Sequence, residues 1–291
     1  MADFREKAKL YYSLTKPRVT YGNVITTVAG FFLASQGNVD WWQLLATTIG
    51  MTFVIGSACA LNNYLDQDID AKMARTKTRA LVQGKLPGRN AVIFSIILGL
   101  LGTVILYATT NLLTTILAIL GFIVYVLFYG MLSKRLSIHG TLVGSISGAV
   151  PILAGYTAVA NTIDVGAILV FLVLFLWQMP EFYSIAIYRR SEYKAAGIPV
   201  MPVVKGVKST KIQIFVYTVE FVIATLLLTA YHYTGYVYLA VMAVSGIYWI
   251  WLGYQGLIAQ DDDAWARKMF HFSLVMLLLF SFMISIDSLL P

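Results

Sequence analysis

The sequence predicts an all-α polytopic membrane protein with nine transmembrane helices, and three observations support this. Hydrophobic residues make up 59% of the 291 residues and charged residues only 12%, with a mean hydropathy of +0.76. So few polar side chains cannot cover the surface of a soluble domain of this size. The apolar residues form runs of about 20 residues, long enough for a helix to cross a bilayer. The basic residues are confined to alternate connections between these runs.

The nine predicted spans follow one another through mostly short connections. Their expected ranges are 19–35, 41–63, 91–109, 112–132, 141–160, 165–187, 212–231, 236–258 and 269–289. Residues 2–14 are expected to form a short amphipathic helix on the membrane surface, with Phe4, Leu10, Tyr11 and Leu14 toward lipid. A frayed tail is the alternative for this segment.

All 21 Lys and Arg residues fall on the same side of the nine-span arrangement. They occupy the N-terminal segment and the connections after the second, fourth, sixth and eighth spans. The positive-inside rule places that side in the cytoplasm, so we expect a cytoplasmic N-terminus and an extracytoplasmic C-terminus. This distribution accounts for the net charge of +7 and argues against nucleic acid as a partner.

We expect residues 1–291 to form one transmembrane domain. Two charged connections, 64–90 and 188–211, are long, whereas the others are tight. Each of the two follows an even-numbered span, and we expect them to form a cap over a functional site. Gly144 and Gly148 stand at GxxxG spacing in the fifth span, which favours close helix packing.

The densest polar stretch, residues 62–79, reads NNYLDQDIDAKMARTKTR and follows the second span directly. If the helix continues through it, Asn62, Asp66 and Asp70 recur every four residues and form one polar stripe. Carboxylates on one helix face suit a divalent cation. Mg²⁺ takes few protein carboxylates and completes its coordination shell with water and substrate phosphate oxygens. The stripe therefore predicts a site for a metal and a diphosphate.

Basic residues in the same stretch would bind the remaining phosphate charge. The alternative interpretation is a solvated helix end whose acids are balanced by Lys72, Arg75 and Arg79. A carboxylate stripe continuous with a membrane span favours the functional interpretation, because such residues face a bundle interior or a water-filled cavity.

The second long connection also combines acids with bases. Glu192 stands among Arg189, Arg190 and Lys194, where it is either a second acid on the metal side or half of a surface ion pair. Both interpretations remain open from the residues alone.

Two glutamates fall inside predicted spans. Glu181 follows Pro180 in the sixth span, and Glu220 lies in the seventh. Burying an unpaired carboxylate is costly, so each is expected to have a partner or a role in proton transfer.

These residues resemble those of a known family. The N-x-x-x-D-x-x-x-D pattern of residues 62–70 is similar to the first motif of the UbiA-type intramembrane prenyltransferases. The segments TKPR at 15–18, SKR with GSISGAVPILAGY at 133–156, and YRRSEYKAAGIPVMPVVKG at 188–206 resemble the heme O synthase branch. The resemblance covers nearly the whole chain. It implies a UbiA-type bundle in a bacterial inner or plasma membrane, with the active site on the cytoplasmic side.

The resemblance also implies a reaction. Farnesyl diphosphate binds with Mg²⁺ as cofactor, its C–O bond ionises, and a vinyl group of protoheme (heme B) traps the allylic cation. Water then supplies the hydroxyl group of heme O. Farnesyl diphosphate, protoheme and the lipid bilayer are thus the expected partners, and the resemblance suggests heme A synthase or a terminal oxidase as a protein partner.

Carried over by motif, the catalytic residues are Asn62, Asp66, Asp70 and Glu192, of which the first three hold the metal. The residues expected to bind the diphosphate or the heme propionates are Lys72, Arg75, Arg79, Lys134, Arg135, Arg189 and Arg190.

Two positions depart from the branch pattern. Glu181 stands where the branch commonly has histidine after the second-motif proline, and Glu192 replaces the aspartate that usually precedes the tyrosine. The second change keeps a carboxylate. We place Glu181 on the acceptor side together with His139 of the connection after the fourth span, and we assign neither as an iron ligand.

Two other functions fit part of the sequence. A UbiA-type enzyme acting on another acceptor, such as an aromatic quinone precursor, would share the first motif, but the AAGIP and PVVKG segments argue against it. A membrane transporter with a cytoplasm-facing cation site would carry ionisable groups across the membrane depth. Here only Asp40, Asp164 and Asp287 lie toward the other side.

Overall fold

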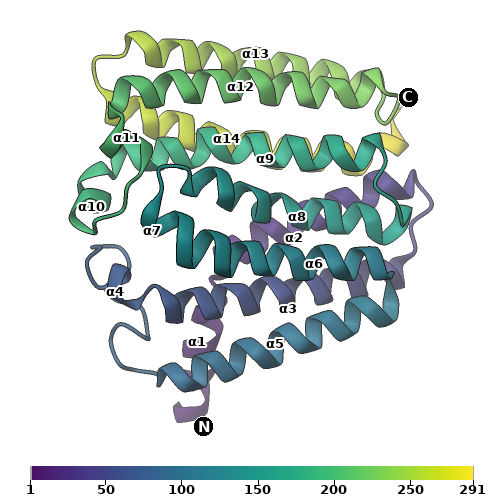
Figure 1. The fold of residues 1–291 in the computed structure, drawn as a ribbon. Helices are drawn as coiled ribbons and strands as arrows, with labels where there is room; N and C mark the ends of the chain where they lie inside the picture. Colours follow the sequence, from purple (N-terminus) through teal and green to yellow (C-terminus); the bar gives the residue numbers. More distant parts are fainter. Residues whose placement is uncertain (1, 291) are drawn as a thin grey trace.

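The computed structural model describes residues 2–290, and this part of the chain is helical without any strand. Residues 1 and 291 of the predicted single domain lie outside this range. Nine long helical segments run back and forth within one bundle (Figure 1). They are α2 (Pro17–Ser35), α3 (Trp41–Leu65), α5 (Gly88–Thr109), the α6–η1–α7 run (Leu112–Ile123, Val124–Ser133, Lys134–Leu136), α8 (Gly140–Ala160), α9 (Val165–Tyr188), α12 (Gly206–Ala230), α13 (Tyr236–Ile258) and α14 (Asp262–Ile286).

Eight of these segments in the described part of the chain are long and apolar enough to cross a membrane by length and composition. The prediction of a multi-pass, all-α membrane protein is thereby confirmed. The remaining segment, α2, has 19 residues and contains Thr20, Asn23 and Thr26 among its apolar residues. The ninth span therefore stays a prediction, as does the orientation of the bundle in the membrane.

Three helices begin earlier than expected. Helices α5, α12 and α14 begin at Gly88, Gly206 and Asp262, several residues before the predicted ranges. Hydropathy alone excluded their first turns, because those turns carry charged side chains. At α14 the carboxylate of Asp261 caps the helix by accepting hydrogen bonds from the backbone N–H groups of Asp263 and Ala264 at 3.1 and 2.9 Å.

The fourth predicted span is not a uniform α-helix. Residues Val124–Ser133 form a π-helix, η1, between α6 and the single turn α7. A π-helical stretch changes the direction in which the following side chains point and often marks a functional site. Here it precedes Lys134 and Arg135.

Helix α1 (Ala2–Leu14) confirms the predicted N-terminal helix but corrects the role of its apolar residues. Leu14 is buried with Ala60, Ala80, Leu81, Leu86 and Ala91, and Leu10 and Tyr11 pack against the same cluster. Only Phe4 of the four expected lipid-facing residues is largely exposed, at 76%. The helix thus packs on the protein, because α3, α5 and the connection between them offer an apolar surface.

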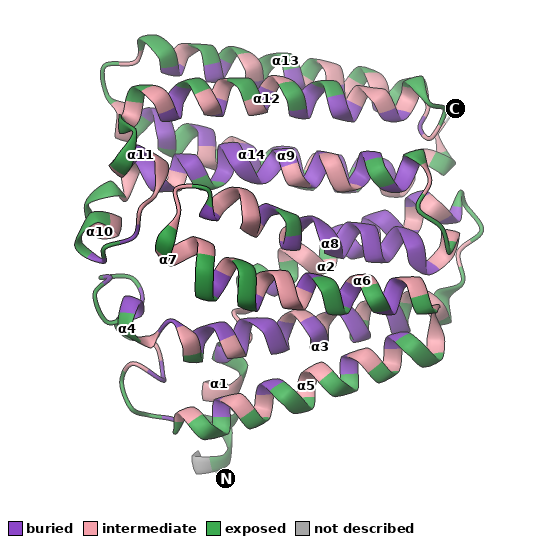
Figure 2. Ribbon diagram, in the orientation of Figure 1, coloured by how far each residue is buried: buried purple, intermediate pink, exposed green. Residues whose placement is uncertain are grey.

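Helices α8 and α9 form the centre of the bundle. In each, 67% of the most apolar window is buried, compared with 22% in α5, and Figure 2 shows the same contrast. Helix α2 packs closely on α8: a Cβ on Gly155 would stand 1.9 Å from the Thr27 carbonyl oxygen. These helices define the interior that the polar residues below face.

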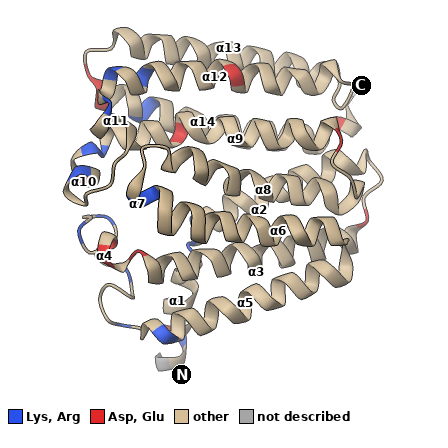
Figure 3. Cartoon of the chain, in the orientation of Figure 1, with Lys and Arg blue, Asp and Glu red and all other residues tan. Residues whose placement is uncertain are grey.

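Lys and Arg residues gather at one end of the bundle, which we call the charged end (Figure 3). The short helices α4 (Gln67–Asp70), α10 (Arg190–Ala195) and α11 (Met201–Val204) lie at this end. The 3₁₀ turn η2 (Asp287–Leu289) and the C-terminus lie at the other end. The one-sided placement of the bases along the sequence therefore exists in three dimensions.

Candidate active site

The predicted polar stripe forms at the charged end of α3. The backbone N–H of Asp66 donates to the Asn62 carbonyl at 3.0 Å, and that of Asp70 donates to the Asp66 carbonyl at 2.8 Å. The helical hydrogen bonds thus continue from α3 into α4, although Asp66 itself leaves ideal helical geometry. Asn62, Asp66 and Asp70 are all buried, with exposed fractions of 2%, 1% and 3%. The structure brings the three residues onto one enclosed face, as the spacing predicts.

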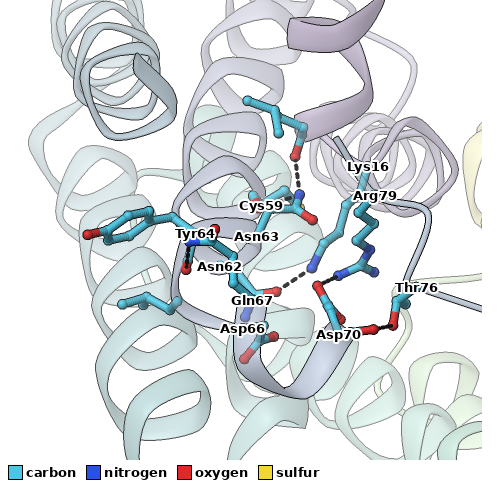
Figure 4. Close-up of polar contacts among 12 residues, drawn as sticks. Lys16, Cys59, Asn62, Asn63, Tyr64, Asp66, Gln67, Asp70, Thr76 and Arg79 are labelled. Carbon is cyan, nitrogen blue, oxygen red and sulfur yellow. Dashed lines mark hydrogen bonds and ion pairs between the residues drawn. The ribbon is translucent and has the colours of Figure 1, made fainter. Parts of the chain in front are cut away.

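Each stripe residue contacts a basic side chain from another part of the chain. Arg79 donates to a carboxylate oxygen of Asp70 at 2.5 Å, and the ammonium of Lys134 forms an ion pair with Asp66. The Asp70 carbonyl also accepts a hydrogen bond from Thr76 at 3.0 Å. Figure 4 shows Arg79 and Thr76 on the same side of Asp70. The loop after α4 therefore folds back over the stripe.

Arg135 binds two other residues where α3 ends and α4 begins, Asp68 and Leu65. Its guanidinium donates to both carboxylate oxygens of Asp68 at 2.7 and 2.8 Å and to the Leu65 carbonyl at 2.7 Å. These hydrogen bonds lower the pKa of Asp68 to about 2. Arg135 lies 3.9 Å from Asp66 as well. Lys134 and Arg135, which directly follow the π-helix η1, thus form ion pairs with Asp66 and Asp68 of the first motif.

Lys16 is a site residue that the sequence reasoning missed. Its ammonium donates to the side-chain carbonyl oxygen of Asn62, so a base from the α1–α2 connection meets the stripe (Figure 4). Burial lowers the pKa of Lys16 to about 8. The residue adopts the left-handed conformation, with φ 49°, which is strained for a lysine and is found preferentially at functional sites. Lys16 belongs to the TKPR segment, but no sequence spacing linked this segment to Asn62.

Two polar atoms of the stripe have no hydrogen-bond partner among the described residues. They are the second carboxylate oxygen of Asp66 (Oδ1) and the amide nitrogen of Asn62 (Nδ2), both buried. The Asp66 oxygen lies 3.9 Å from Arg135 but accepts no hydrogen bond from the described residues, so it can serve as a ligand for a metal ion. No group of three or more His, Cys, Asp or Glu residues within the described chain is arranged as a complete metal site. A cation bound here would therefore need ligands from water or substrate.

The second motif lies opposite the first. Ile69 and Met73 of the first connection are buried together with Ala196 and Ile198 of the second, with Tyr193 packed against them. Arg189 pairs with Glu192 at 2.8 Å, and the other carboxylate oxygen of Glu192 is buried without a partner, like that of Asp66. Burial raises the pKa of Tyr193, which lies within the electrostatic reach of Arg75, Lys134 and Arg189. The two long connections thus pack against each other beside the stripe.

A UbiA prenyltransferase family model matches residues 23–275. This chain belongs to the UbiA prenyltransferase family. It is also 47% identical over 286 residues, covering 98% of this chain and 95% of its relative, to a protein of Chromobacterium violaceum named protoheme IX farnesyltransferase 2. The family assignment made from the motifs is confirmed.

Solved structures show the same UbiA-family fold. A digeranylgeranylglyceryl phosphate synthase superimposes with a TM-score of 0.81 at 21% identity, covering 97% of this chain and 99% of the other. A UbiA homolog from Archaeoglobus fulgidus, bound to GPP and Mg²⁺, superimposes with a TM-score of 0.69 at 13% identity, covering 95% and 99%. At these identities the structures establish the fold of this UbiA member and not its acceptor.

Several predicted site residues of this UbiA member form no ion pair with the stripe acids in the described part of the chain. Arg190 forms an ion pair with Asp263 of α14 and donates to the Ile187 carbonyl. His139 is exposed at the start of α8, where its backbone N–H donates to Ser137, and no contact among the described residues joins its ring to the stripe. Lys72 and Arg75 are exposed near the stripe without an ion-pair partner in the described chain. Of the seven predicted anion-binding residues, Arg79, Lys134 and Arg135 contact first-motif acids directly.

The two glutamates inside spans differ in environment. Glu181 is 8% exposed and makes no hydrogen bond or ion pair within residues 2–290, so the expected partner is missing. Glu220 is exposed on α12 and also has no ion-pair partner among the described residues. Glu181 is thus a buried carboxyl group that takes part in no ion pair or hydrogen bond within the described residues.

Proposed function

We propose that this chain is a protoheme IX farnesyltransferase, which transfers the farnesyl group of farnesyl diphosphate to a vinyl group of protoheme. Addition of water completes the product, heme O, and diphosphate is released. The observation that carries the proposal is the buried Asn62–Asp66–Asp70 stripe with its contacting bases. Its occurrence in a chain 47% identical to a protein named protoheme IX farnesyltransferase 2 selects the substrates.

Asn62, Asp66 and Asp70 would hold Mg²⁺ in this proposal. The Asp66 oxygen that accepts no hydrogen bond from the described residues supports this role, as do the oxygen atoms of the other two side chains. The Archaeoglobus homolog, which has the same fold, is bound to GPP together with Mg²⁺. When bound, the ion supplies positive charge that stabilises the departing diphosphate.

The basic residues hold the anionic end of the substrate. Lys16, Arg79 and Lys134 converge on the stripe from three separate parts of the chain. Lys16 faces a neutral amide and not a carboxylate, so its positive charge is the least compensated of the three. Preorganised cations of this kind stabilise the charge that develops on the diphosphate as the C–O bond breaks.

The bundle interior protects the allylic cation. Val173, Leu174 and Trp177 of α9 belong to the buried apolar core of the bundle, which would surround the cation with apolar side chains. An enclosed apolar site excludes water until the vinyl group has formed the new carbon–carbon bond.

We further propose that residues 1–291 act as one domain and that the two long connections cap the site. The gathering of bases at the charged end supports placing this end in the cytoplasm of a bacterium. The product would pass to heme A synthase or a terminal oxidase in the same membrane.

Purified protein incubated with farnesyl diphosphate, Mg²⁺ and protoheme tests the function. Mass analysis of the extracted heme should show an increase equal to one farnesyl group plus one water, and a chelator should abolish it. A parallel incubation with an aromatic acid in place of protoheme should give no prenylated product. Unchanged heme, or prenylation of the aromatic acid instead, would reject the proposed acceptor.

A further inference from the structure

Glu181 stands out because no pair or hydrogen bond explains its burial. It lies on α9 with an exposed fraction of 8%, and no donor or cation contacts its carboxyl group within residues 2–290. An unpaired carboxyl group inside a membrane bundle is costly, so its presence calls for a role in chemistry. Three residues further along α9, the hydroxyl of Ser184 is also buried without a partner.

The contacts of Gln178, three residues before Glu181, show that its face of α9 packs against α8. Its amide nitrogen donates to the Ser145 carbonyl of α8 at 3.1 Å. Its amide oxygen lies 1.9 Å from where a Cβ on Gly148 would stand, so only glycine leaves room for it. Glu181 follows Gln178 by three residues and therefore shares approximately the same helix face, about 4.5 Å closer to the charged end.

The part of α8 around Gly144 and Ser145 lies between this face of α9 and the Asn62–Asp66–Asp70 stripe. Helices α8 and α9 are antiparallel and Gln178 contacts Ser145 and Gly148, so Glu181, three residues further along α9, lies near the level of residues 142–145 of α8. The ring of Tyr129 stands 3.0 Å from the position of a Cβ on Gly144. Tyr129 in turn lies within the electrostatic reach of Asp66. Tyr129 and Gln178 thus both pack against α8, and these two residues relate the position of Glu181 to that of Asp66.

The proposed reaction needs a group that accepts a proton close to the heme substrate. When the vinyl π electrons bond to the farnesyl carbon, positive charge appears on the vinyl carbon next to the porphyrin. A lone pair of water then forms the new C–O bond, and one O–H bond of that water must break. Its electron pair stays on oxygen, giving the neutral alcohol, and its proton needs a base.

We propose that Glu181 is the general base that accepts the proton of the water that adds to the prenylated vinyl group. The inference rests on the proposed function. Its carboxyl oxygens are not engaged by any donor in the described chain, so they are free to bind that water. Arg79 and Lys134 pair with the stripe acids and are assigned to the diphosphate, so the proton of the water needs a different group.

The product mixture of the variant Glu181→Gln tests this role. We expect heme O formation to fall about 100-fold, the usual contribution of a general base. The trapped cation should instead lose a proton from the neighbouring carbon, giving a farnesylated heme lighter than heme O by one water. Glu181→Asp, which moves the carboxylate back by one methylene, should give an intermediate ratio of the two products.

Glu220→Gln is the matched control, because it makes the same change at an exposed glutamate of another span. It should keep the product ratio of the unmodified protein. If Glu181→Gln kept that ratio, at normal or reduced total turnover, the proposal would be overturned. If Glu181→Gln does not accumulate in membranes, an unchanged ratio in Glu181→Asp overturns it in the same way. Absence of any farnesylated heme from the unmodified protein would instead reject the proposed function.

Discussion

Lys134 and Asp66, which are 68 residues apart in the chain, form an ion pair at the charged end of the bundle. The Asp66 side chain is 1% exposed and that of Lys134 is 17% exposed. One Asp66 oxygen contacts the lysine, and the other lies 3.9 Å from Arg135 and accepts no hydrogen bond within residues 2–290. The Asp66 carboxylate can therefore bind a metal ion through one oxygen, while Lys134, which contacts the other oxygen, is positioned to contact the substrate.

Replacing Asp66 by asparagine should reduce heme O formation at least about 100-fold, because charge stabilisation at the diphosphate is lost. The free energy of unfolding should fall by about 1–3 kcal/mol, since Lys134 loses its partner. Product analysis and denaturation of the same preparation measure the two effects. Asp68→Asn is the control: Asp68 is exposed, and its loss should leave turnover within about threefold, as expected for a surface pair.

The double variant Asp66→Asn with Lys134→Met separates the two effects. Removing both charges should restore most of the lost stability, because no unpaired ion remains. Turnover should stay as low as in Asp66→Asn alone. Recovery of activity together with stability would mean that Asp66 serves only the fold.

Lys16→Met should raise the KM for farnesyl diphosphate about 10- to 100-fold, the equivalent of one charge-assisted hydrogen bond. Initial rates at varied farnesyl diphosphate concentration measure this effect. Arg18→Met, two residues away and exposed, is the control and should leave the KM unchanged. Equal KM values for Lys16→Met and the unmodified protein would remove Lys16 from the site.

Arg189 and Arg190 should behave differently despite being adjacent. Arg190→Ala should cost about 1 kcal/mol or less, because its pair with Asp263 is half exposed, and should leave the KM for farnesyl diphosphate unchanged. Arg189→Ala should raise that KM about tenfold, because Arg189 lies beside Glu192 and within reach of Tyr193. Kinetics of both variants distinguish them, and a large KM change in Arg190→Ala alone would reverse the assignment.

Gly148→Ala should destabilise the protein by about 1–3 kcal/mol, because the added methyl group overlaps the Gln178 amide oxygen. Displacing Gln178 should also disturb Glu181 and lower heme O formation. Gly22→Ala is the control, since no atom lies within 4 Å of its added Cβ. Thermal denaturation and product analysis of both variants check this, and equal melting of the two would contradict the close packing.

Much of this architecture could be predicted from sequence because it depends on local patterns. Apolar run length predicted the spans, and the four-residue spacing predicted the buried stripe of Asn62, Asp66 and Asp70. The pairing of distant residues could not be predicted in this way. Lys16 reaches Asn62 across 46 residues, and only the packing of the α1–α2 connection on the bundle brings them together.

The π-helix η1 and the inward face of α1 were missed for related reasons. Hydropathy does not distinguish a π-helix from an α-helix, so the direction of Lys134 and Arg135 could not be deduced. Leu10, Tyr11 and Leu14 were expected to face lipid, because an amphipathic pattern does not say whether lipid or protein covers its apolar side. Arg190 was grouped with Arg189 by its motif, whereas its partner Asp263 lies 73 residues away.

The most direct test of the account is a structure of the protein with Mg²⁺ and a non-hydrolysable farnesyl diphosphate analogue. The metal should contact Asp66 and Asp70, and Lys16, Arg79 and Lys134 should contact the diphosphate oxygens. The farnesyl chain should extend into the bundle toward α9. A diphosphate bound away from the stripe, without contact to Lys16, Arg79 or Lys134, would contradict the proposed site.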